Sequence, residues 1–591
     1  MSYLGPLRIH FAGRFRATPP TVNNDPRNYG RRDVDEGFNP AGDSAWRLLD
    51  CRVTGAFREN GTDAGDDPVT RYRVADADQR VSAKIVDLDP QQQLVSEIWG
   101  LELRLVDSGG VTALRGVVAP AAMSDLWQRD ATADGDAGLS ATYQSVIGEL
   151  EWDDLGGSAV LRELRAAVEG QLSIKFNLDR FEMGSRSPDF MIGRIVGTIG
   201  AAHPGEPRHF VLGRQLVAQA TPGEGPVFKP LGRLGSCPAV VDQQSRRVYV
   251  DLGNALPSSD VGEPVPPALR LTCGDTNLGD VPIGDADWYE RTAGVVVVPG
   301  PSAKPLAAEL LEHALAEPLE LSAAKWHVAE PPGGNHVRAD RFVYRMAPGD
   351  AIDVDLYATR FGVALPGASV IVYADPGQLQ GPSGETSGSS GWPRVAYPPG
   401  ALDYDRHLTT DADGIARLNL RAGDPGGQRG AIDGQVFGLR PVLEQSLSID
   451  AAPNPGEFVS VLVWDRFESV DPPTWYATIE PIFHSYKRLY PVMDVVVDLS
   501  SYDEVCANRE LLLFAFALPV SDPNSMPVSR DLSPSKRAVI VRWLGDLGES
   551  GRPRLGNRED RRPEPGAVRE SPSAARPVHG KTGAASFRGA R

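Results

Sequence analysis

The residues with the clearest potential for metal chemistry lie near the end of the sequence, where Met526 stands before Pro527 and a helix pattern that ends with Trp543. A methionine in such a loop could offer its sulfur to haem iron. A haem held in this way normally has a histidine on its other side and is attached near a Cys-x-x-Cys-His sequence. The sequence contains no such motif. We therefore interpret Met526 as a loop residue and Ser533 as the cap of the helix that follows.

Two pairs of glutamate and histidine have spacings that occur in metal sites. Glu206 and His209 are three residues apart, but Pro207 is incompatible with the regular helix that such a pair requires. Glu309 and His313 lie on a predicted helix and form a single pair. A carboxylate-bridged di-iron centre needs several glutamates and Glu-x-x-His pairs on facing helices. We predict no metal site from these residues.

Two further motifs are incomplete. Residues 411–414, Asp-Ala-Asp-Gly, have the start of a calcium loop but lack its remaining oxygen ligands, and Asp-Gly between strands favours a hairpin turn. Ser-x-x-Lys occurs at 322–325 and 533–536 and Lys-Thr-Gly at 581–583, as in penicillin-binding enzymes. In those enzymes the Lys-Thr-Gly lies on a strand, whereas here it lies in a predicted tail. The sequence thus predicts no catalytic residue, no cofactor and no metal.

The spacing of the cysteines and the hydropathy of the sequence indicate the cellular compartment. The four cysteines, at positions 51, 237, 273 and 506, lie far apart, which predicts free thiols rather than a zinc site. The first residues lack the basic and apolar segments of a secretory signal. The longest apolar run, at 511–520, is too short to cross a bilayer. We therefore expect a cytoplasmic protein with no membrane segment.

The composition predicts a β-rich chain with several domains. A length of 591 residues is too great for one hydrophobic core, and 62 glycines and 50 prolines favour turns over long helices. The net charge of −18 argues against a nucleic-acid partner, because such binding depends on lysine and arginine. Residues 551–591 instead hold ten basic and four acidic residues among Gly, Pro and Ser. We predict that 547–591 is a disordered basic tail.

Alternating side chains predict a β-rich region over residues 1–300. Near its start, apolar residues 7, 9 and 11 alternate with Arg8 and His10, which indicates a strand with one buried face. A lone histidine on such a strand is more often a structural residue than a catalyst. Further strands are predicted at 83–88, 101–106, 172–177, 190–198, 247–252 and 294–298, and a helix at 158–170.

The remainder of the chain divides into three folded parts. A helix from 302 to 316 and a linker occupy residues 301–334, and residues 335–470 form a small antiparallel β-sandwich of broadly immunoglobulin-like character. Residues 471–546 form a small helical subdomain with helices at 475–489, 502–517 and 534–545. The predicted fold class is therefore mainly β and multidomain, with a β-rich N-terminal region, a β-sandwich, a small C-terminal helical subdomain and a disordered tail.

Seven short segments occur in an order that resembles the iminophenyl-pyruvate dimer synthase family, which includes the violacein-pathway enzyme and the chromopyrrolate synthases of indolocarbazole pathways. They are Leu-Arg-Ile-His-Phe-Ala-Gly-Arg-Phe at 7–15, Thr-Val-Asn-Asn-Asp-Pro at 21–26, Phe-Asn-Pro-Ala-Gly at 38–42, Phe-Met-Ile-Gly-Arg-Ile-Val-Gly at 190–197, Trp-Tyr-Ala-Thr-Ile-Glu at 475–480, Arg-Leu-Tyr-Pro-Val-Met at 488–493 and Met-Pro-Val-Ser-Arg-Asp-Leu-Ser at 526–533. The resemblance covers residues 5–300 and 470–545 and matches the sandwich poorly.

Members of that family couple two oxidised tryptophan-derived imines. The resemblance implies that they carry iron in a ferritin-like helical domain after the segment corresponding to residues 526–544. Fewer than fifty residues follow Leu544 here, and we expect no room for a four-helix bundle. No catalytic residue of the family is therefore carried over. The resemblance implies an accessory or partner-docking protein of secondary metabolism that lacks the iron-binding domain.

We favour that accessory role, in which the isolated chain is not itself an enzyme. The partner would be a separately encoded ferritin-like or oxidase protein. Arg530 and Asp531 would mark the docking face if the loop before the last helix is exposed. The same two residues could equally serve to fix the loop.

Two other functions remain open. The chain could be a stand-alone oxidative enzyme acting on an aromatic substrate derived from an amino acid. Trp46, Trp99, Trp288 or Tyr289 would then line its pocket, although scattered aromatic residues usually belong to a core. Alternatively, the sandwich could be a binding module for carbohydrate or protein, which the fold alone supports.

Overall fold

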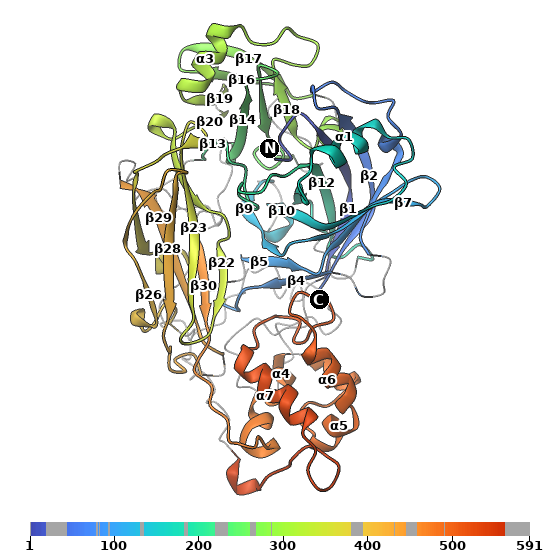
Figure 1. Cartoon of the computed structure of the whole chain (residues 1–591), viewed down its shortest axis with the longest axis vertical. Coiled ribbons are helices and arrows are strands. Elements are labelled where there is room, and N and C mark those ends of the chain that lie inside the picture. The colour runs from blue at the N-terminus through green and yellow to red at the C-terminus, as the bar shows by residue number, and fades with distance from the viewer. Residues whose placement is uncertain are drawn as a thin grey trace, which may run out of the picture.

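A computed structural model gives the architecture of the chain. It describes residues 2–18, 44–77, 81, 83–92, 95–130, 135–182, 187–218, 234–259, 268–284, 287–324, 326–379, 394–430, 432–444, 458–489 and 491–561. Over these residues the fold is mainly β and multidomain, with a small helical region near the C-terminus, as the sequence predicts. Figure 1 shows a β-sandwich beside a large curved sheet, and the helical subdomain at one end of the long axis.

The largest sheet closes on itself. β1 (Arg8–Ala17) pairs with β12 (Ile192–Ala201) on one side and with β2 (Ala45–Phe57) on the other. The described strands therefore form a ring in the order β1, β12, β11, β10, β7, β6, β3 and β2, which we call the closed sheet. Its other strands are β3 (Arg73–Ala75), β6 (Glu102–Val106), β7 (Thr112–Val118), β10 (Leu139–Trp152) and β11 (Leu172–Asp179), and its extensions are β4 (Ala83–Asp87), β5 (Ser96–Trp99), β8 (Ala121–Ala122) and β9 (Ser124–Gln128).

Aromatic side chains fill the interior of the closed sheet. Trp46 is completely buried and stacks on Phe176, with 5.4 Å between ring centroids. Phe176 also stacks on Tyr143 at 4.6 Å. Gly197 leaves room for the Phe11 ring, because a Cβ at Gly197 would lie 2.3 Å from a Phe11 ring carbon. The ring of strands is therefore a packed core rather than a ligand cavity.

One helix packs into the same core. α1 (Ala159–Ala167) buries Val160, Leu161 and Leu164, as the amphipathic pattern at 158–170 predicts. Its first turn is capped twice, because the Ser158 hydroxyl accepts from the backbone N–H of Leu161 at 3.0 Å and Asp67 accepts from two further N–H groups.

Two four-stranded sheets, with α2 (Trp288–Thr292) and α3 (Ala308–Ala316), form what we call the middle unit. They share one apolar core, which also includes Ala12 and Val196 from the outer face of the closed sheet. α3 begins later than the predicted residue 302, because Pro305 disfavours helical backbone at the residue before it. The strands are β13 (Arg214–Leu216), β14 (Cys237–Asp242), β15 (Arg247–Asp251) and β18 (Val295–Val298) in one sheet, and β16 (Ala268–Cys273), β17 (Thr276–Pro282), β19 (Leu319–Ala323) and β20 (Trp326–Ala329) in the other.

The β-sandwich consists of two facing sheets around a separate core. One holds β21 (Asn335–Ala339), β23 (Ala351–Arg360), β24 (Val363–Ala364), β26 (Leu402–Tyr404) and β28 (Ile415–Ala422). The other holds β22 (Val343–Met346), β25 (Ser369–Ala374), β27 (His407–Thr409), β29 (Gln435–Leu443) and β30 (Val459–Val463). β22 and β30 run parallel, which differs from the wholly antiparallel arrangement expected, and the other pairs are antiparallel.

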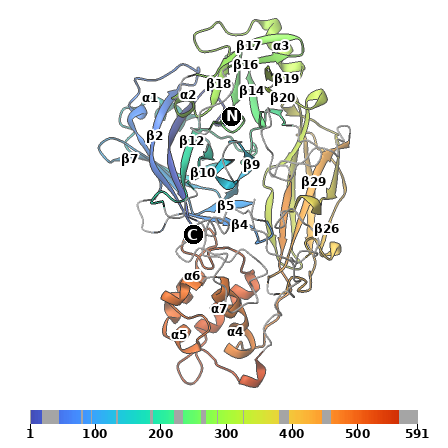
Figure 2. The same ribbon diagram turned by 180° about the vertical axis from the view of Figure 1, so that it is seen from behind.

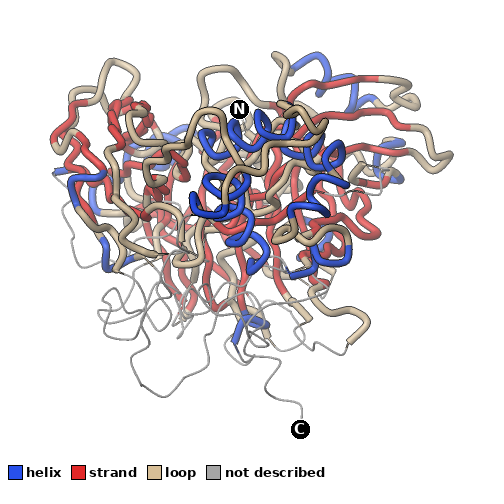
Figure 3. The backbone as a smooth tube through the Cα atoms, turned by 90° about the horizontal axis from the view of Figure 1, so that it is seen from below, coloured by secondary structure: helices blue, strands red, loops and turns tan. Residues whose placement is uncertain are grey.

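The helical subdomain contains α4 (Glu480–Leu489), α5 (Tyr502–Ala507), α6 (Arg509–Ala517) and α7 (Pro534–Gly545). Figure 3 shows its helices in front of the strands when the molecule is seen from below. The predicted helix 502–517 is interrupted at Asn508, whose φ of −101° and ψ of 18° are not helical. The predicted helix at 475–489 starts with a wide π turn at Trp475–Ile479, because Pro481 has no N–H to bond the preceding turn. Among the described helices, none is both long and apolar enough to span a membrane.

Part of the predicted tail is ordered. Residues 547–561 lie along the helical subdomain, where the Arg554 carbonyl accepts from the backbone N–H of Trp475 at 2.9 Å and the indole N–H of Trp543 at 2.8 Å. Arg561 forms an ion pair with Glu480. The tail prediction is therefore wrong for 547–561, because buried helix donors bind this segment. The remainder of the predicted tail, 562–591, lies outside the described residues.

Buried ion pairs connect the sandwich to the extension of the closed sheet. Arg429, which is 1% exposed, donates from both terminal nitrogens to Asp89, at 2.7 and 2.8 Å. Arg345 on β22 pairs with Glu97 on β5 through one terminal nitrogen. The two-pronged contact of Arg429 fixes distance and orientation together. These pairs hold the two β units in one relative arrangement, which Figure 2 shows from behind.

We predict that Arg429→Met destabilises the protein by about 3–5 kcal/mol, because it leaves Asp89 buried without its counterion. Chemical denaturation should show a separate early transition of the sandwich. In the double variant Arg429→Met with Asp89→Leu, most of the loss should be recovered, since no uncompensated charge then remains. Arg421→Met, at an exposed pair with Asp403, is the control and should barely shift the midpoint. A single unaltered transition in Arg429→Met would show that the Arg429–Asp89 ion pair does not hold the sandwich to the closed sheet.

Candidate functional site

The two residues predicted to mark a docking face lie at a contact within the chain. Arg530 is 2% exposed and donates to the backbone carbonyls of Val528 at 2.7 Å and Asp522 at 2.8 Å. The expected exposure of the loop is therefore wrong at Arg530. Its guanidinium fixes the loop by satisfying buried carbonyl groups. Whether the loop also binds a partner stays a prediction.

Asp531 joins the helical subdomain to the sandwich. Its carboxylate accepts from the Tyr486 hydroxyl at 3.0 Å, and its backbone carbonyl accepts from the indole N–H of Trp464 at 2.7 Å. Burial raises the pKa of Asp531 above its ordinary value. Nearby, Lys536 on α7 pairs with Asp433 of the sandwich at 2.7 Å. This loop therefore anchors the helices to the rest of the protein.

The aromatic residues predicted for a substrate pocket are not brought together around one cavity. Trp46 lies inside the closed sheet, and Trp288 belongs to the core of the middle unit. The guanidinium carbon of Arg345 lies 5.7 Å from the centroid of the Trp99 ring. Tyr289 takes part in a polar network described below. Met526 packs against the core of the helical subdomain as a half-buried loop residue.

The outer face of the closed sheet carries buried charges. Along β11 the even-numbered side chains face the interior and the odd-numbered ones, including Lys175 and Asp179, face outward. All eight residues are buried, and so are Arg8 and His10 on β1. The expectation of one buried face on β1 is therefore wrong. The middle unit covers the face that the alternation alone would assign to solvent.

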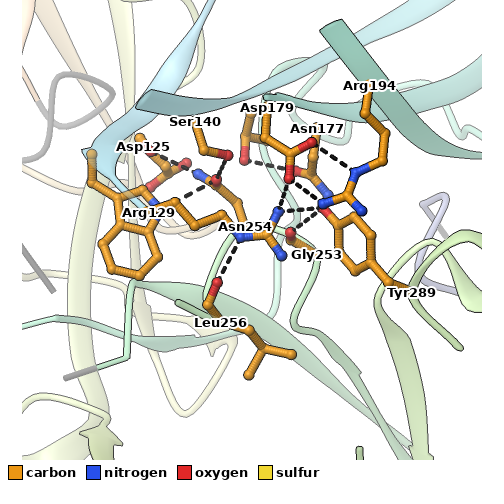
Figure 4. Close-up of polar contacts among 12 residues, drawn as sticks. Asp125, Arg129, Ser140, Asn177, Asp179, Arg194, Gly253, Asn254, Leu256 and Tyr289 are labelled. Carbon is orange, nitrogen blue, oxygen red and sulfur yellow. Dashed lines mark hydrogen bonds and ion pairs between the residues drawn. The ribbon is translucent and has the colours of Figure 1, made fainter. Parts of the chain in front are cut away.

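One buried network is centred on Asp179 (Figure 4). Its carboxylate accepts from Arg194 at 2.6 and 2.9 Å and also pairs with Arg129. Burial alone would raise the pKa of Asp179, but the two guanidinium groups outweigh burial and lower it. Arg129 also donates to the carbonyl of Leu256 at 2.6 Å and to the hydroxyl of Tyr289 at 2.7 Å. The network thus joins the closed sheet to the middle unit.

A second buried network is centred on Asp251. Lys175 approaches its carboxylate at 2.7 and 2.8 Å, the Tyr3 hydroxyl donates at 2.7 Å, and the Gly253 N–H donates at 2.9 Å. Burial lowers the pKa of Lys175 and raises the pKa of Tyr3 far above its ordinary value. Tyr3 therefore stays protonated and acts as a donor.

The carbonyl of Gly253 links the two networks, because it accepts from the Tyr289 hydroxyl at 2.6 Å, and Asn254 follows it in the chain (Figure 4). The side-chain oxygen of Asn254 accepts from the Ser140 hydroxyl at 2.5 Å and from the indole N–H of Trp127 at 3.3 Å. Its amide nitrogen donates to the backbone carbonyl of Asp125 at 2.7 Å. The amide therefore holds the segment after β15 against β9 and β10 of the closed sheet.

Beside the second network lies a polar cavity of about 40 Å³, where the closed sheet, the middle unit and the sandwich meet. The three units contribute Lys175, Asp251 and Arg338 respectively. Cavities at junctions between domains are common ligand sites in proteins. Its other lining residues are Tyr3, Ser124, Asp125, Thr142, Gln144, His209, Phe210, Val211, Gln215, Leu216, Val217, Ser236, Cys237, Pro238 and Asn254.

The cavity is suited to holding a polar group rather than to nucleophilic attack. Burial raises the pKa of the Cys237 thiol well above its ordinary value, so the reactive thiolate is suppressed. Burial lowers the pKa of His209, so this residue is neutral near pH 7. Lys175 is engaged by Asp251. Within the described parts of the chain, no group of three or more His, Cys, Asp or Glu residues is arranged to hold a metal.

Sequence reasoning did not single out the residues of the two networks. The signal in the sequence is the segment 172–179, Leu-Ser-Ile-Lys-Phe-Asn-Leu-Asp, which alternates perfectly. Such a pattern normally indicates a solvated polar face. Only the partner Asp251, supplied to Lys175 by the middle unit, distinguishes this buried polar face from an exposed one.

Comparisons with known proteins identify no family. No protein-family model and no curated protein matches the sequence. Among solved structures, the chain is similar over 23% of its length to 47% of a two-domain protein of unknown function from Bacteroides fragilis, with 10% identity and a TM-score of 0.17. It thus spans about half the length of that protein. The adhesin InvE of Yersinia pseudotuberculosis matches 37% of this chain over 54% of its own, with 14% identity and a TM-score of 0.14. Domains 4 and 5 of the S-layer protein SbsC match 42% of this chain over 96% of their own, with 7% identity and a TM-score of 0.14. Similarities with TM-scores this low indicate neither the fold nor the function of the chain.

We predict that His10 makes stability depend on pH. Burial, with help from Arg8 and Lys175, holds its pKa far below the ordinary 6.5, and its Nε2 accepts from Arg8 at 3.0 Å. The neutral form therefore stabilises the fold above about pH 6.5, and that contribution is lost as the pH falls. Below that pH, His10 should contribute about 1.4 kcal/mol per pH unit to the pH dependence of the free energy of unfolding.

Denaturation of the wild type and of His10→Gln between pH 5 and pH 8 tests this prediction. The variant should lose that contribution to the slope of unfolding free energy against pH, because glutamine does not titrate. His327→Gln is the control, since the His327 side chain is 57% exposed and should leave the slope unchanged. An equal slope in His10→Gln and the wild type would show that His10 does not titrate as described.

Proposed function

We propose that the chain is an accessory docking protein of secondary metabolism, whose helical subdomain binds a helical, metal-binding partner protein. The observation that supports this proposal is an apolar surface on α6. Leu511 and Phe514 are 52% and 62% exposed. Their spacing of three places them side by side on the helix surface.

α6 is apolar on both sides. Leu512 and Phe516 pack in the core of the subdomain, while Leu511 and Phe514 face away from it. A helix that is apolar all round normally has neighbours on every side. Val520, just after the helix, is 39% exposed and adds to the apolar character of this region. Exposed apolar surface of this kind favours a protein partner.

The partner is proposed to be helical for two reasons. A protruding pair at spacing three fits the grooves between side-chain ridges of another helix. In the family that this chain resembles, the iron-bearing helical domain follows the segment corresponding to 526–544, which here includes α7. α6 packs on α7 within one core, so a partner on α6 would lie near the corresponding position.

Two exposed acidic side chains lie on α5 and α6, and one of them is next to the apolar pair in the chain. Glu510 is next to Leu511, and its side chain is 91% exposed. The Asp503 side chain on α5 is 82% exposed and pairs with Arg552 at 2.6 Å. We therefore expect basic residues around the apolar contact of the partner, since complementary charges at the rim raise association rates.

The alternative of a stand-alone oxidative enzyme has less support. An aromatic substrate of the expected size needs a pocket of about 300 Å³ or more. The junction cavity holds about 40 Å³, and the aromatic residues predicted for a pocket do not line it. The cavity therefore does not suggest such a substrate. The sandwich as a binding module is supported by its fold alone.

We predict that Leu511→Glu with Phe514→Glu weakens partner binding roughly 30-fold, because central apolar anchors contribute about 2 kcal/mol or more. Tagged wild-type protein, purified from its native host, should retain a helical protein that contains iron. The double variant should retain its own circular dichroism and lose that protein. Val363→Glu is the matched control, because Val363 is 64% exposed on the sandwich and should not affect binding.

Two results would contradict the proposal. One is equal retention of the partner by the double variant. The other is wild-type protein that binds only itself, which sedimentation analysis would show as a dimer abolished by the same substitutions.

A further inference from the structure

We propose that the cavity at the junction of the three β units is a binding site for a small carboxylate anion, which Arg338 holds. This site is separate from α6 and does not depend on the docking function. The inference rests on the state of the Arg338 side chain, on the size of the cavity and on the groups that surround it.

Arg338 is a buried cation that lacks an anion. It lies on β21 of the sandwich and is 7% exposed. Among the residues that the structure describes, no hydrogen bond or ion pair reaches its guanidinium, and its Nε is fully buried without an acceptor. The guanidinium carbon of Arg338 lies 5.5 Å from the centroid of the Phe210 ring. A buried charge normally has a counterion, so an anion is the missing element.

Other buried arginines in this chain show what a satisfied site contains. Arg214 pairs with Glu330, and Arg429 donates two hydrogen bonds to the carboxylate of Asp89. Both carboxylates come from distant parts of the sequence. The cavity wall supplies no such group to Arg338, although it contains two carboxylates.

Those two carboxylates are engaged elsewhere. Asp251 is neutralised by Lys175 and also accepts from Tyr3 and Gly253. Asp125 accepts from the hydroxyl of Ser124 at 2.9 Å, and no ion pair joins it to Arg338. The Lys175 and Asp251 charges cancel as an ion pair. The Asp125 carboxylate and the Arg338 guanidinium remain on the cavity wall, and no ion pair joins these two described residues.

The remaining walls can donate hydrogen bonds. Gln144 and Ser236 carry amide and hydroxyl groups, whereas the Thr142 hydroxyl already donates to Asn177 at 3.1 Å. His209 is neutral because burial lowers its pKa. A neutral histidine adds no charge that would compete with Arg338 for the anion. The cavity therefore combines a guanidinium that makes no hydrogen bond or ion pair among the described residues with the uncharged donors Gln144 and Ser236.

The size of the cavity selects the ligand. A buried water molecule needs a cavity of roughly 10–15 Å³. A cavity of about 40 Å³ therefore holds three or four non-hydrogen atoms. A carboxylate group with one further carbon has that size. Its two oxygens match the two-pronged geometry of a guanidinium. Larger carboxylates would have to extend past the half-buried rim residues Gln215, Ser236 and Pro238.

Acetate is the probe that tests the site. Thermal unfolding of the full chain at pH 7, in sodium acetate against sodium chloride at equal ionic strength, measures binding to the folded state. We expect a saturable rise of the midpoint of about 2–4 °C in acetate. Benzoate should give no such rise, because its ring exceeds the cavity.

Arg338→Gln should abolish the acetate effect. The matched control is Arg440→Gln, because Arg440 is equally buried in the sandwich, at 6% exposure, and pairs with Asp375 away from the cavity. The control should lose stability and keep the full acetate response. An acetate response in Arg338→Gln equal to that of the wild type would overturn the proposal.

A second measurement applies if Arg338→Gln does not fold. Carbon-13 labelled acetate, titrated into wild-type protein, should show line broadening that formate reverses and chloride does not. Absence of both broadening and a midpoint shift would mean that only water occupies the cavity, and the proposal would fail.

Discussion

The fold depends on the pairing of charges that the closed sheet presents on its covered outer face. Lys175 and Asp179 point away from the interior, into a region from which the middle unit excludes water. Ionised groups in such a place are tolerated only with counterions and full hydrogen bonding. Asp251 and Arg129 supply the opposite charges, and Arg129 also binds the carbonyl of Leu256. The closed sheet and the middle unit therefore cannot separate without leaving charges unpaired.

The same constraint joins the other parts of the molecule. The sandwich is held to the extension of the closed sheet through Asp89, and the helical subdomain is held to the sandwich through Lys536. Each contact has a defined geometry, so the units form a single body rather than a string of domains. A partner bound to α6 would then have a fixed position relative to the whole protein. Such a fixed arrangement would suit the docking role that we propose.

Arg338 is the place where this pattern of pairing is incomplete. It comes from the sandwich, whereas the other charges around the cavity come from the closed sheet and the middle unit. An anion bound there would contact all three units at their common junction. The proposed docking surface and the proposed anion site thus depend on different interactions: the first on exposed apolar area, and the second on a buried charge. Each can exist without the other.

Local structure was determined by the sequence to a large extent. Period-two alternation located β1, β11 and β12, and the Ser533 cap with Pro534 located α7 to the residue. Propensity and capping act over a few residues, so they can be read from neighbours in the chain. The break at Asn508 was missed, because the apolar pattern on both sides of it is continuous.

The tertiary structure alone decided which polar residues are buried and which are exposed. Lys175 is 76 residues from Asp251, and Arg429 is 340 residues from Asp89. No local pattern distinguishes a charged strand face that meets water from one that meets a counterion. For the same reason Arg530 was expected at the surface and lies buried, and the exposure of Phe514 on α6 could not be read from its helical pattern. The candidate sites arise from long-range packing, because only packing determines where water is excluded.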